Sequence, residues 1–319
     1  MTGPTSGDAS QSPRLRSPAH GFCDDEESRR LLRSRPPEAA LRWVEQATAC
    51  PVVSVRTLRG GMSSAVHRLT LEASSPRFQV VLRRYVRHEL NAEEPDLAAR
   101  EARALRFVES VPLPTPRLIA VDPTGAEAGV PALLMTALPG KVDWWPTDLE
   151  RWLRSLARVL PTIHGASPPP PGLLPAYAPY RQSNYRPPPW ARWPQVWERA
   201  VELALGPAPD LPVGLVQRDF HPGNVLWRHH RISGVVDWQA ASVGPAVVDV
   251  AHCRVNLLGF DRAVAERFTA LWSEESGTEF HPWADIAAIV DFLDDLHSDW
   301  GSEKHLLEDV LADAVAELG

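Results

Sequence analysis

Hydrophobic and polar residues alternate between residues 52 and 85 with the period of two that is typical of β-strands. Three runs carry the alternation, and two further apolar runs follow them after a gap. The five runs are VVSVRTL (52–58), AVHRLTLE (65–72), FQVVLRRY (78–85), RLIAV (117–121) and PALLMTAL (131–138). The pattern predicts five strands, of which the first three form an antiparallel meander.

Apolar residues recur every three or four positions elsewhere, which predicts amphipathic helices. One helix follows Pro37, and another covers residues 96–109 between the third and fourth strands. A third begins at a capping box, Thr147-Asp148-Leu149-Glu150. One helix is expected after residue 201, a hairpin around 225–236, and helices from about 246 to the end. The order predicts an α+β protein with a small antiparallel sheet followed by a larger, mainly helical part.

Two segments lack such periodicity. Residues 1–35 begin with a stretch rich in Gly, Pro, Ser and charged residues, and this range is predicted to be a disordered tail. Residues 168–197 are dense in proline but also contain tyrosines and tryptophans. We expect the second segment to be a partly ordered loop that wraps the core.

Composition and charge exclude several classes of protein. The net charge of -7 argues against nucleic acid as a partner, because broad phosphate binding needs a basic surface. No apolar stretch is long enough to span a membrane or to form a signal peptide. The three cysteines form no paired motif, so we expect neither a disulfide framework nor a zinc site, and a reducing cytoplasm fits.

Only two of the 33 basic residues are lysines, Lys141 and Lys304. The oligomeric state is not indicated.

Three polar residues stand around the predicted hairpin. Asp219 follows an apolar run, Asn224 comes just before the first strand of the hairpin, and Asp237 comes just after the second strand. If the two strands pair, Asn224 and Asp237 lie at the same open end. Carboxylate and amide oxygens suit Mg²⁺. Phosphoryl transfer needs such a metal and a carboxylate that accepts the proton of the attacking hydroxyl.

The string from Asp219 to Trp227, DFHPGNVLW, followed by GVVDW and by Gly244-Pro245 with Asp249, resembles the aminoglycoside phosphotransferase family. The resemblance covers about residues 37–319. It implies a protein-kinase-like fold with an N-lobe over residues 36–138 that forms a nucleotide lid. A C-lobe over residues 139–319 would carry the catalytic groups and the acceptor. The expected activity is transfer of the γ-phosphate of MgATP to a hydroxyl of a small molecule.

The resemblance also assigns roles to residues. Asp219 would be the catalytic base, and Asn224 and Asp237 the magnesium ligands. His221 would brace the loop, and Asp249 would cap or anchor the segment that follows it. The ATP-binding residues would comprise the first turn of the sheet, the cation of the third strand, its helical partner and the hinge. These are Gly60, Gly61, Ser63, Ser64, Arg83, Glu101, Met135 and Ala137.

Two positions depart from the family pattern. Arg83 stands where the family carries a phosphate-binding lysine, and neither lysine of the chain is on that strand. Arginine keeps the charge and can bind phosphate with two donors, but its planar guanidinium is not an ammonium. Gln217-Arg218-Asp219 replaces the more common His-Gly-Asp. A glutamine cannot take the cationic role of a histidine.

Other functions stay open on the sequence alone. The two departures favour, as an alternative, a nucleotide-binding pseudokinase with weak or no catalysis, and a metal-dependent hydrolase ranks third. Aminoglycosides, macrolides, choline-like alcohols, sugars and amino alcohols are all candidate acceptors, because fold does not fix the substrate. The acidic segment from Asp285 to the end could receive a cationic acceptor or could be a solvated helical face.

Overall fold

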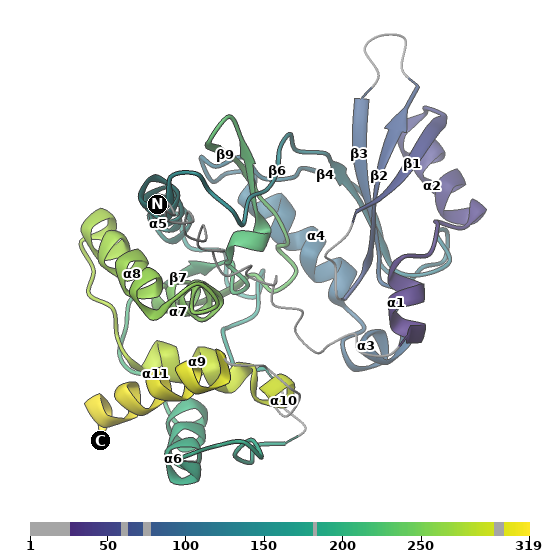
Figure 1. Ribbon diagram of the computed structural model, residues 1–319. Helices are drawn as coiled ribbons and strands as arrows, with labels where there is room; N and C mark the ends of the chain where they lie inside the picture. The colour runs from purple at the N-terminus through teal and green to yellow at the C-terminus, as the bar shows by residue number, and fades with distance from the viewer. Residues whose placement is uncertain (1–25, 59–62, 73–77, 181–183, 297–302) are drawn as a thin grey trace, which may run out of the picture.

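The computed structural model describes residues 26–58, 63–72, 78–180, 184–296 and 303–319 (Figure 1). Its first half contains a five-stranded antiparallel sheet with the strand order β1-β2-β3-β5-β4. The strands are β1 (Val52–Leu58), β2 (Ala65–Leu71), β3 (Phe78–Arg84), β4 (Leu118–Asp122) and β5 (Ala132–Thr136). All five coincide with the predicted runs, three alternating and two apolar, to within one or two residues at each end.

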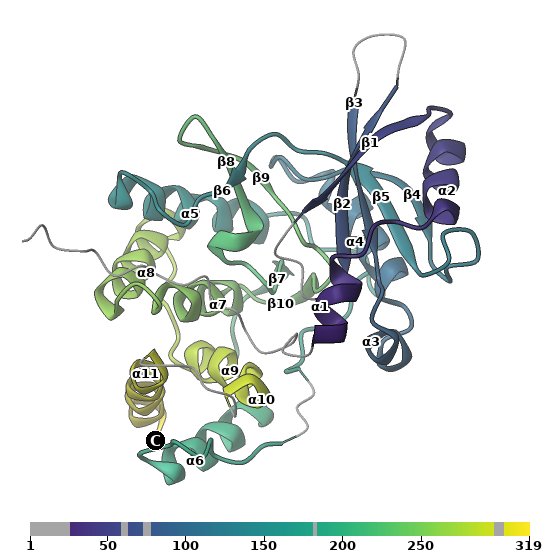
Figure 2. The same cartoon turned by 45° about the vertical axis from the view of Figure 1, so that its right-hand side comes forward.

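Helices cover both faces of this sheet. On one face, Ala40, Trp43 and Val44 of α2 (Glu38–Thr48) share a buried cluster with alternate residues of β2, β3 and β5. On the other face, α4 (Leu97–Val108) packs against Leu133 of β5 and joins the large core of the second half. Helix α4 therefore lies between the sheet and the C-terminal helices, as Figures 1 and 2 show.

The second half is mainly helical. Two small antiparallel sheets are embedded in it, with the orders β10-β7 and β6-β8-β9. Their strands are β6 (Lys141–Val142), β7 (Val213–Val216), β8 (Val225–Arg228), β9 (Arg231–Val235) and β10 (Ser242–Pro245). The helices are α5 (Leu149–His164), α6 (Pro194–Leu205), α7 (Val247–Leu257), α8 (Arg262–Ser276), α9 (Trp283–Asp291), α10 (Leu293–Leu296) and α11 (Glu303–Leu318). The predicted α+β architecture is confirmed.

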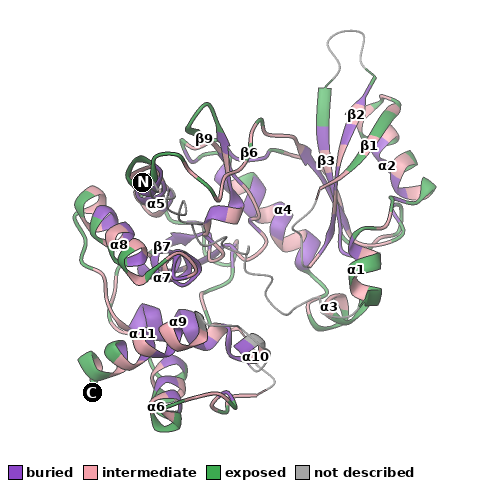
Figure 3. Cartoon of the chain, viewed as in Figure 1, coloured by how far each residue is buried: buried purple, intermediate pink, exposed green. Residues whose placement is uncertain are grey.

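Burial explains the position of these elements. Helix α7 is buried over almost its whole length, whereas α2, α5 and α8 are buried along one side and exposed along the other (Figure 3). Helix α5 begins at Asp148, whose side chain accepts a hydrogen bond from the Arg151 amide at 3.0 Å, as expected of an N-cap. The central helix α7 carries Asp249 and His252, which contact the loop after β7.

Three segments differ from the expectations. Residues 1–25 lie outside the described residues, but Glu26–Leu32 form helix α1, so the predicted tail to residue 35 is wrong in this part. Leu32 is buried against the sheet, and this burial offsets the cost of ordering the helix. Helix α6 begins at Pro194 rather than after residue 201, since Pro is favoured in the first helical turn. The short helix α3 (His88–Glu93) was not predicted.

The proline-rich segment wraps the helical part, as expected, and is held by distant polar groups. The Tyr180 amide donates to Asp291 Oδ1 at 2.8 Å, and the Trp190 indole donates to the Leu296 carbonyl at 2.7 Å. The Arg192 side chain bonds Glu308 at 2.7 Å. These contacts join residues more than a hundred positions apart, and they order a segment that has no internal periodicity.

None of the described helices is both long and apolar enough to cross a lipid bilayer.

The buried His67 on β2 predicts a pH dependence of stability. Burial, together with the positive charge of Arg84, lowers the pKa of His67 from 6.5 to about 4. The unfolded chain therefore takes up a proton at a higher pH than the folded chain. We expect the free energy of unfolding to fall as the pH falls from 6.5 to about 4.

Chemical denaturation at several pH values measures this effect. The His67→Leu variant should lose stability less steeply across the same range, while the exposed His88→Leu control should follow the wild type. Equal slopes for wild type and His67→Leu would show that another group is responsible.

Candidate active site

The loop after β7 is fixed by one buried carboxylate. Asp249, on α7, is fully buried and accepts hydrogen bonds from the Gln217 amide at 3.0 Å and from the Arg218 amide at 2.6 Å. It also bonds His164 Nε2 at 3.0 Å. Asp249 was expected to anchor the segment that follows it. It instead binds the segment that precedes Asp219, because α7 packs beneath the end of β7.

Arg218 adopts a left-handed backbone conformation, with φ of 68°, in which the chain turns sharply before Asp219. Its guanidinium stacks on the rings of Tyr180 and Tyr177, at 3.7 and 5.0 Å from their centroids. It also lies 3.6 Å from Asp291. The uncommon backbone conformation is thus supported by three side chains from the wrapping segment and α9.

The β8–β9 hairpin brings Asn224 and Asp237 together, as the sequence predicted. Val225 pairs with Val235 in the ladder, and the Val236 amide donates to the Asn224 carbonyl at 2.9 Å. The turn at the far end is tight because His229 and His230 both have positive φ, as a two-residue turn of this kind requires. Asn224 also donates from Nδ2 to Asp219 Oδ2 at 2.8 Å. Asn224 is therefore in contact with Asp219 on one side and with the segment of Asp237 on the other, and the three residues lie close together.

Arg83 links this point to the five-stranded sheet. Its Nη1 donates to Glu101 Oε1 at 2.7 Å, and its two terminal nitrogens donate to the two oxygens of Asp237 at 2.9 and 2.8 Å. Its Nε donates to Ser64 Oγ at 2.7 Å. Burial opposes the charge of Arg83, but Asp237 and Glu101 raise its pKa well above the usual value. Arg83 is thus a fully engaged cation beside Asp237.

Glu101 is nearly inaccessible to solvent and is shared between two groups. Burial raises the pKa of Glu101, and the Arg83 charge opposes this shift. The Tyr85 hydroxyl donates to Oε2, while Arg83 holds Oε1. The helix-borne carboxylate therefore orients the guanidinium of Arg83, which is the geometry that the sequence resemblance implied.

Asp219 is half-buried, with its side chain 32% exposed, and it lies among nitrogen donors. Burial alone would raise its pKa, but the hydrogen bond with His252 Nε2, the charges of His221 and His252, and the bond with Asn224 lower the pKa to about 2. The carboxylate is therefore ionised near neutral pH, and this is the form that can accept a proton. Burial lowers the pKa of the neighbouring His221.

His252 was missed in the sequence analysis. It stands three residues after Asp249 on α7, and residues at this spacing share one face of a helix. The signal was the pair Asp249 and His252, which could be interpreted only once Asp249 was known to face the loop before Asp219. His221 braces that loop, as expected, because its Nδ1 accepts from the Gly223 amide at 3.2 Å.

Gln217 stands where the family pattern has a histidine, and both the oxygen and the nitrogen of its side-chain amide form hydrogen bonds. Its Oε1 accepts from the Asp219 amide at 2.8 Å, while its Nε2 donates to the carbonyls of Asp237 and Val236 at 2.6 and 3.1 Å. One uncharged side chain thus joins the segment of Asp219 to the segment of Asp237. The substitution preserves the connection between the two loops without a cation.

Loss of this amide should weaken both loops. In Gln217→Ala, the Asp219 amide and the Asp237 carbonyl lose their buried partner, which costs about 1–3 kcal/mol of stability. Turnover should fall as well, because the two loops lose their direct link. Gln217→His should recover part of both properties. Thermal unfolding and steady-state kinetics measure the two effects, with the exposed Gln79→Ala as the control. If Gln217→Ala matches the control, the link has no function.

The remaining residues predicted to bind ATP are placed less centrally. Gly60 and Gly61 lie outside the described residues, and Ser63 bonds Gln239 at 3.3 Å. Met135 pairs with Val81 on one side and with Leu118 on the other. The Ala137 amide donates to the Gln79 carbonyl at 3.3 Å. No hydrogen bond joins Met135 or Ala137 to the group around Asp237 within the described part of the chain.

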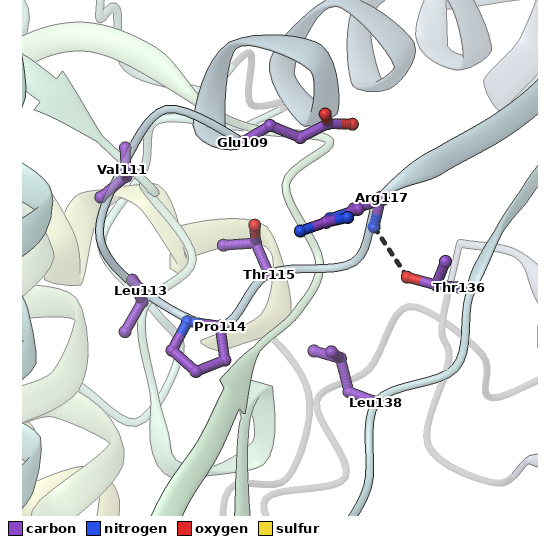
Figure 4. A pocket seen from close by; sticks show the side chains of 8 residues that line it. All are labelled: Glu109, Val111, Leu113, Pro114, Thr115, Arg117, Thr136 and Leu138. Atoms are coloured by element: carbon purple, nitrogen blue, oxygen red, sulfur yellow. Dashed lines mark hydrogen bonds between the residues drawn. The ribbon is translucent and has the colours of Figure 1, made fainter.

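A cavity of about 460 Å³ lies beside the end of β5 (Figure 4). Arg117 enters it from the start of β4, and its backbone amide donates to the Thr136 hydroxyl at 2.9 Å. The cavity is lined by Glu109, Val111, Leu113, Pro114, Thr115, Arg117, Thr136 and Leu138. Thr136 and Leu138 belong to the segment 135–138 that was predicted as the hinge, whereas none of the lining residues belongs to the group around Asp219.

Several carboxylates of the acidic C-terminal region bind arginines of the same chain. Asp285 pairs with Arg254 at 2.9 Å, and Asp313 pairs with Arg262 at 2.7 Å. Glu308 is fully buried against Arg192. These carboxylates stabilise the helical part and the wrapping segment.

The comparisons with known proteins agree with this geometry. No curated protein sequence matches the chain at a significant level. Solved structures match at low identity. A thermostable mutant of aminoglycoside phosphotransferase APH(4)-Ia, in a ternary complex with ADP and hygromycin B, is 16% identical with a TM-score of 0.60, covering 87% of this chain and 98% of its own. Macrolide 2′-phosphotransferase MphH from Brachybacterium faecium is 18% identical with a TM-score of 0.56, covering 86% and 98%.

The ternary complex of APH(2″)-IIa with streptomycin and ATP is 15% identical with a TM-score of 0.53, covering 82% of this chain and 88% of its own. These likenesses show that the chain has the protein-kinase-like fold. The model of the phosphotransferase enzyme family matches residues 54–286, which is more than half of the chain and includes Arg83, Glu101, Asp219, Asn224, Asp237, Asp249 and His252. The chain belongs to the phosphotransferase enzyme family.

Proposed function

We propose that this enzyme transfers the γ-phosphate of MgATP to a hydroxyl group of a small molecule, with Asp219 as the base. The observation that carries the proposal is the convergence of Asp219, Asn224 and Asp237, with Arg83 beside them. Each supplies a property that phosphoryl transfer needs: a proton acceptor, two oxygen donors for a metal and a cation for phosphate.

The residues around Asp237 fit a magnesium ion. Asn224 uses its side-chain nitrogen to bond Asp219, and its side-chain oxygen accepts no hydrogen bond from any described residue. Asp237 is partly exposed, and within the described residues its carboxylate forms an ion pair with one cation, Arg83. These oxygens are the ligand type that Mg²⁺ prefers. When bound, the metal would neutralise charge on the phosphates.

The sheet supplies the second positive group. Arg83 is held by Glu101 and Ser64, so its guanidinium stays at the edge of the site. The two N–H groups that bond Asp237 would bind phosphate oxygens once a metal ion replaces them at the Asp237 carboxylate. We assign Arg83 to the non-transferred phosphates. Gly60, Gly61, Ser63, Met135 and Ala137 stay predictions for the contacts with the rest of the nucleotide.

The transfer step uses the ionised carboxylate of Asp219. As the acceptor oxygen forms its bond to the γ-phosphorus, the hydroxyl proton moves to Asp219, and the bond between the γ-phosphorus and the bridging oxygen breaks. ADP leaves with that electron pair. Asn224 and Gln217 keep Asp219 and Asp237 in fixed relation during the step, because each bonds both segments.

The structural neighbours support a small-molecule acceptor. They include complexes with hygromycin B and with streptomycin, and a macrolide 2′-phosphotransferase. The self-paired carboxylates near the C-terminus make a polycationic acceptor less favourable than the sequence alone suggested. An acceptor panel should therefore hold macrolides, sugars and amino alcohols as well as aminoglycosides.

One observation favours a second function, nucleotide binding without transfer. Arg83 occupies both oxygens of Asp237, and this bidentate pair competes with a metal for the same carboxylate. If the pair persists when nucleotide binds, the protein would bind nucleotide without magnesium and would transfer no phosphate.

Titration with the ATP analogue AMP-PNP separates the two functions. The kinase should bind AMP-PNP more tightly with Mg²⁺ than with EDTA, and Asp237→Asn should remove this difference. Asp210→Asn changes an exposed aspartate and serves as the control. Equal affinity with and without Mg²⁺ in the wild type would contradict the proposed function.

A further inference from the structure

Both oxygens of the Asp219 carboxylate are held, and by different elements. Asn224, in the loop before β8, donates to Oδ2 at 2.8 Å. His252, on α7, places Nε2 3.0 Å from Oδ1. His221 Nε2 lies 3.9 Å from the same oxygen, which is beyond hydrogen-bond distance. Among the described residues, His252 is therefore the side chain that is ion-paired with Oδ1 at hydrogen-bond distance.

The position of His252 is itself well fixed. The residue is 8% exposed, and its ring packs against Phe292 with centroids 5.2 Å apart. Its helix is bonded to the catalytic loop one turn earlier, where Asp249 receives the amides of Gln217 and Arg218. Helix α7 thus holds the backbone before Asp219 with one side chain and its carboxylate with another.

With the backbone before Asp219 held in place, its carboxylate can still rotate about the side-chain bond. The contacts of Asn224 and His252 with its two oxygens restrict this rotation. A general base must present one oxygen to the hydroxyl within hydrogen-bond reach, and a small misplacement lowers the rate strongly. Asn224 lies beside Asp237, on the side proposed for the metal, so Oδ1 is the oxygen left for the acceptor. His252, on α7, contacts Oδ1 and thereby fixes the orientation of the Asp219 carboxylate.

We propose that His252 is a positioning residue for phosphoryl transfer, which donates from Nε2 to Asp219 and holds Oδ1 toward the acceptor hydroxyl. The proposal rests on the proposed kinase function. It adds to that function a second support for the base, supplied by the first buried helix after the metal loop. The contact needs a donor at this distance, and it does not need an aromatic ring.

Two substitutions separate hydrogen bonding from packing. His252→Phe keeps the ring that packs on Phe292 but removes the donor, whereas His252→Gln removes the ring and keeps an N–H donor of similar reach. Phosphate release from MgATP, with water as the acceptor, is the readout. We expect His252→Phe to lower kcat by about 10- to 100-fold with little change in KM for MgATP, and His252→Gln to regain most of the rate.

His230→Gln, in the exposed turn between β8 and β9, is the matched control and should behave as the wild type. A packing role predicts the opposite order, in which phenylalanine is tolerated and glutamine is not. That order, or a His252→Phe variant with the wild-type kcat, would overturn the proposal.

A second readout does not depend on turnover. In protein labelled with ¹⁵N at histidine, the ring signals of His252 are identified by their loss in His252→Gln. Asp219→Asn should shift these signals, because the partner of Nε2 changes from a carboxylate to an amide. Unchanged signals would overturn the contact. If the signals shift but the wild-type protein releases no phosphate and phosphorylates no acceptor, the kinase function fails, and the transfer role of His252 fails with it.

Discussion

Replacement of Asp219 by asparagine is expected to lower phosphate transfer by about 100- to 10,000-fold, the usual contribution of a general base. An amide cannot accept the hydroxyl proton as the carboxylate does. In addition, His252 and Asn224 both approach Asp219 with nitrogen atoms, at 3.0 and 2.8 Å. An asparagine has a single side-chain oxygen for these two donors, so one of them loses its partner.

Affinity for AMP-PNP should change little in Asp219→Asn, because Arg83 and Asp237 are unaltered. This split between turnover and affinity distinguishes a base from a residue that binds the nucleotide. Steady-state kinetics and calorimetric titration measure the two quantities, and Asp210→Asn again controls for the loss of one negative charge. Turnover within a few-fold of the wild type would show that another group accepts the proton.

Replacement of Arg83 by alanine should have the second large effect. Arg83 is the buried cation between Glu101 and Asp237, and its removal leaves two carboxylates facing one another without compensation. Breaking a buried pair in this way costs about 3–5 kcal/mol. The variant should therefore unfold at a lower temperature and bind nucleotide weakly.

Arg83→Lys tests the departure from the family pattern. A lysine retains the charge but cannot reproduce the four hydrogen bonds of the planar group to Ser64, Glu101 and Asp237. We expect partial stability and partial turnover. The exposed Arg56→Ala on β1 is the control for thermal unfolding and titration. If Arg83→Ala keeps wild-type affinity and turnover, the assignment of Arg83 to the phosphates is wrong.

The sheet and the hairpin were predictable because their signals are local. Alternation over seven residues defines a strand with one buried face, and the residues at the two ends of a hairpin are adjacent whatever the rest of the chain does. For this reason the sequence alone brought Asn224 and Asp237 together. The same local reasoning placed the start of α5 within one residue, although the cap is Asp148 and not Thr147 of the predicted capping box.

The contacts that support the site were not predictable in this way. Asp249 and His252 contact a loop about thirty residues earlier in the sequence. Arg192 binds Glu308, which is 116 residues later in the sequence. No periodic pattern encodes such pairs, because tertiary packing decides them. The Gln217 side chain is a related case. Its amide can bond both Asp219 and Asp237 only because the loops that carry them lie close together in the folded chain.

The central claim is that this site moves a phosphoryl group from ATP to a hydroxyl. The most direct measurement follows γ-labelled phosphate from MgATP across the acceptor panel by mass spectrometry, with wild type and Asp219→Asn side by side. The wild type should attach one labelled phosphoryl group to an acceptor hydroxyl only when Mg²⁺ is present, and Asp219→Asn should form almost none of this product. A wild type that binds MgATP but labels no acceptor and releases no phosphate, so that it cannot be told apart from Asp219→Asn, would contradict the account.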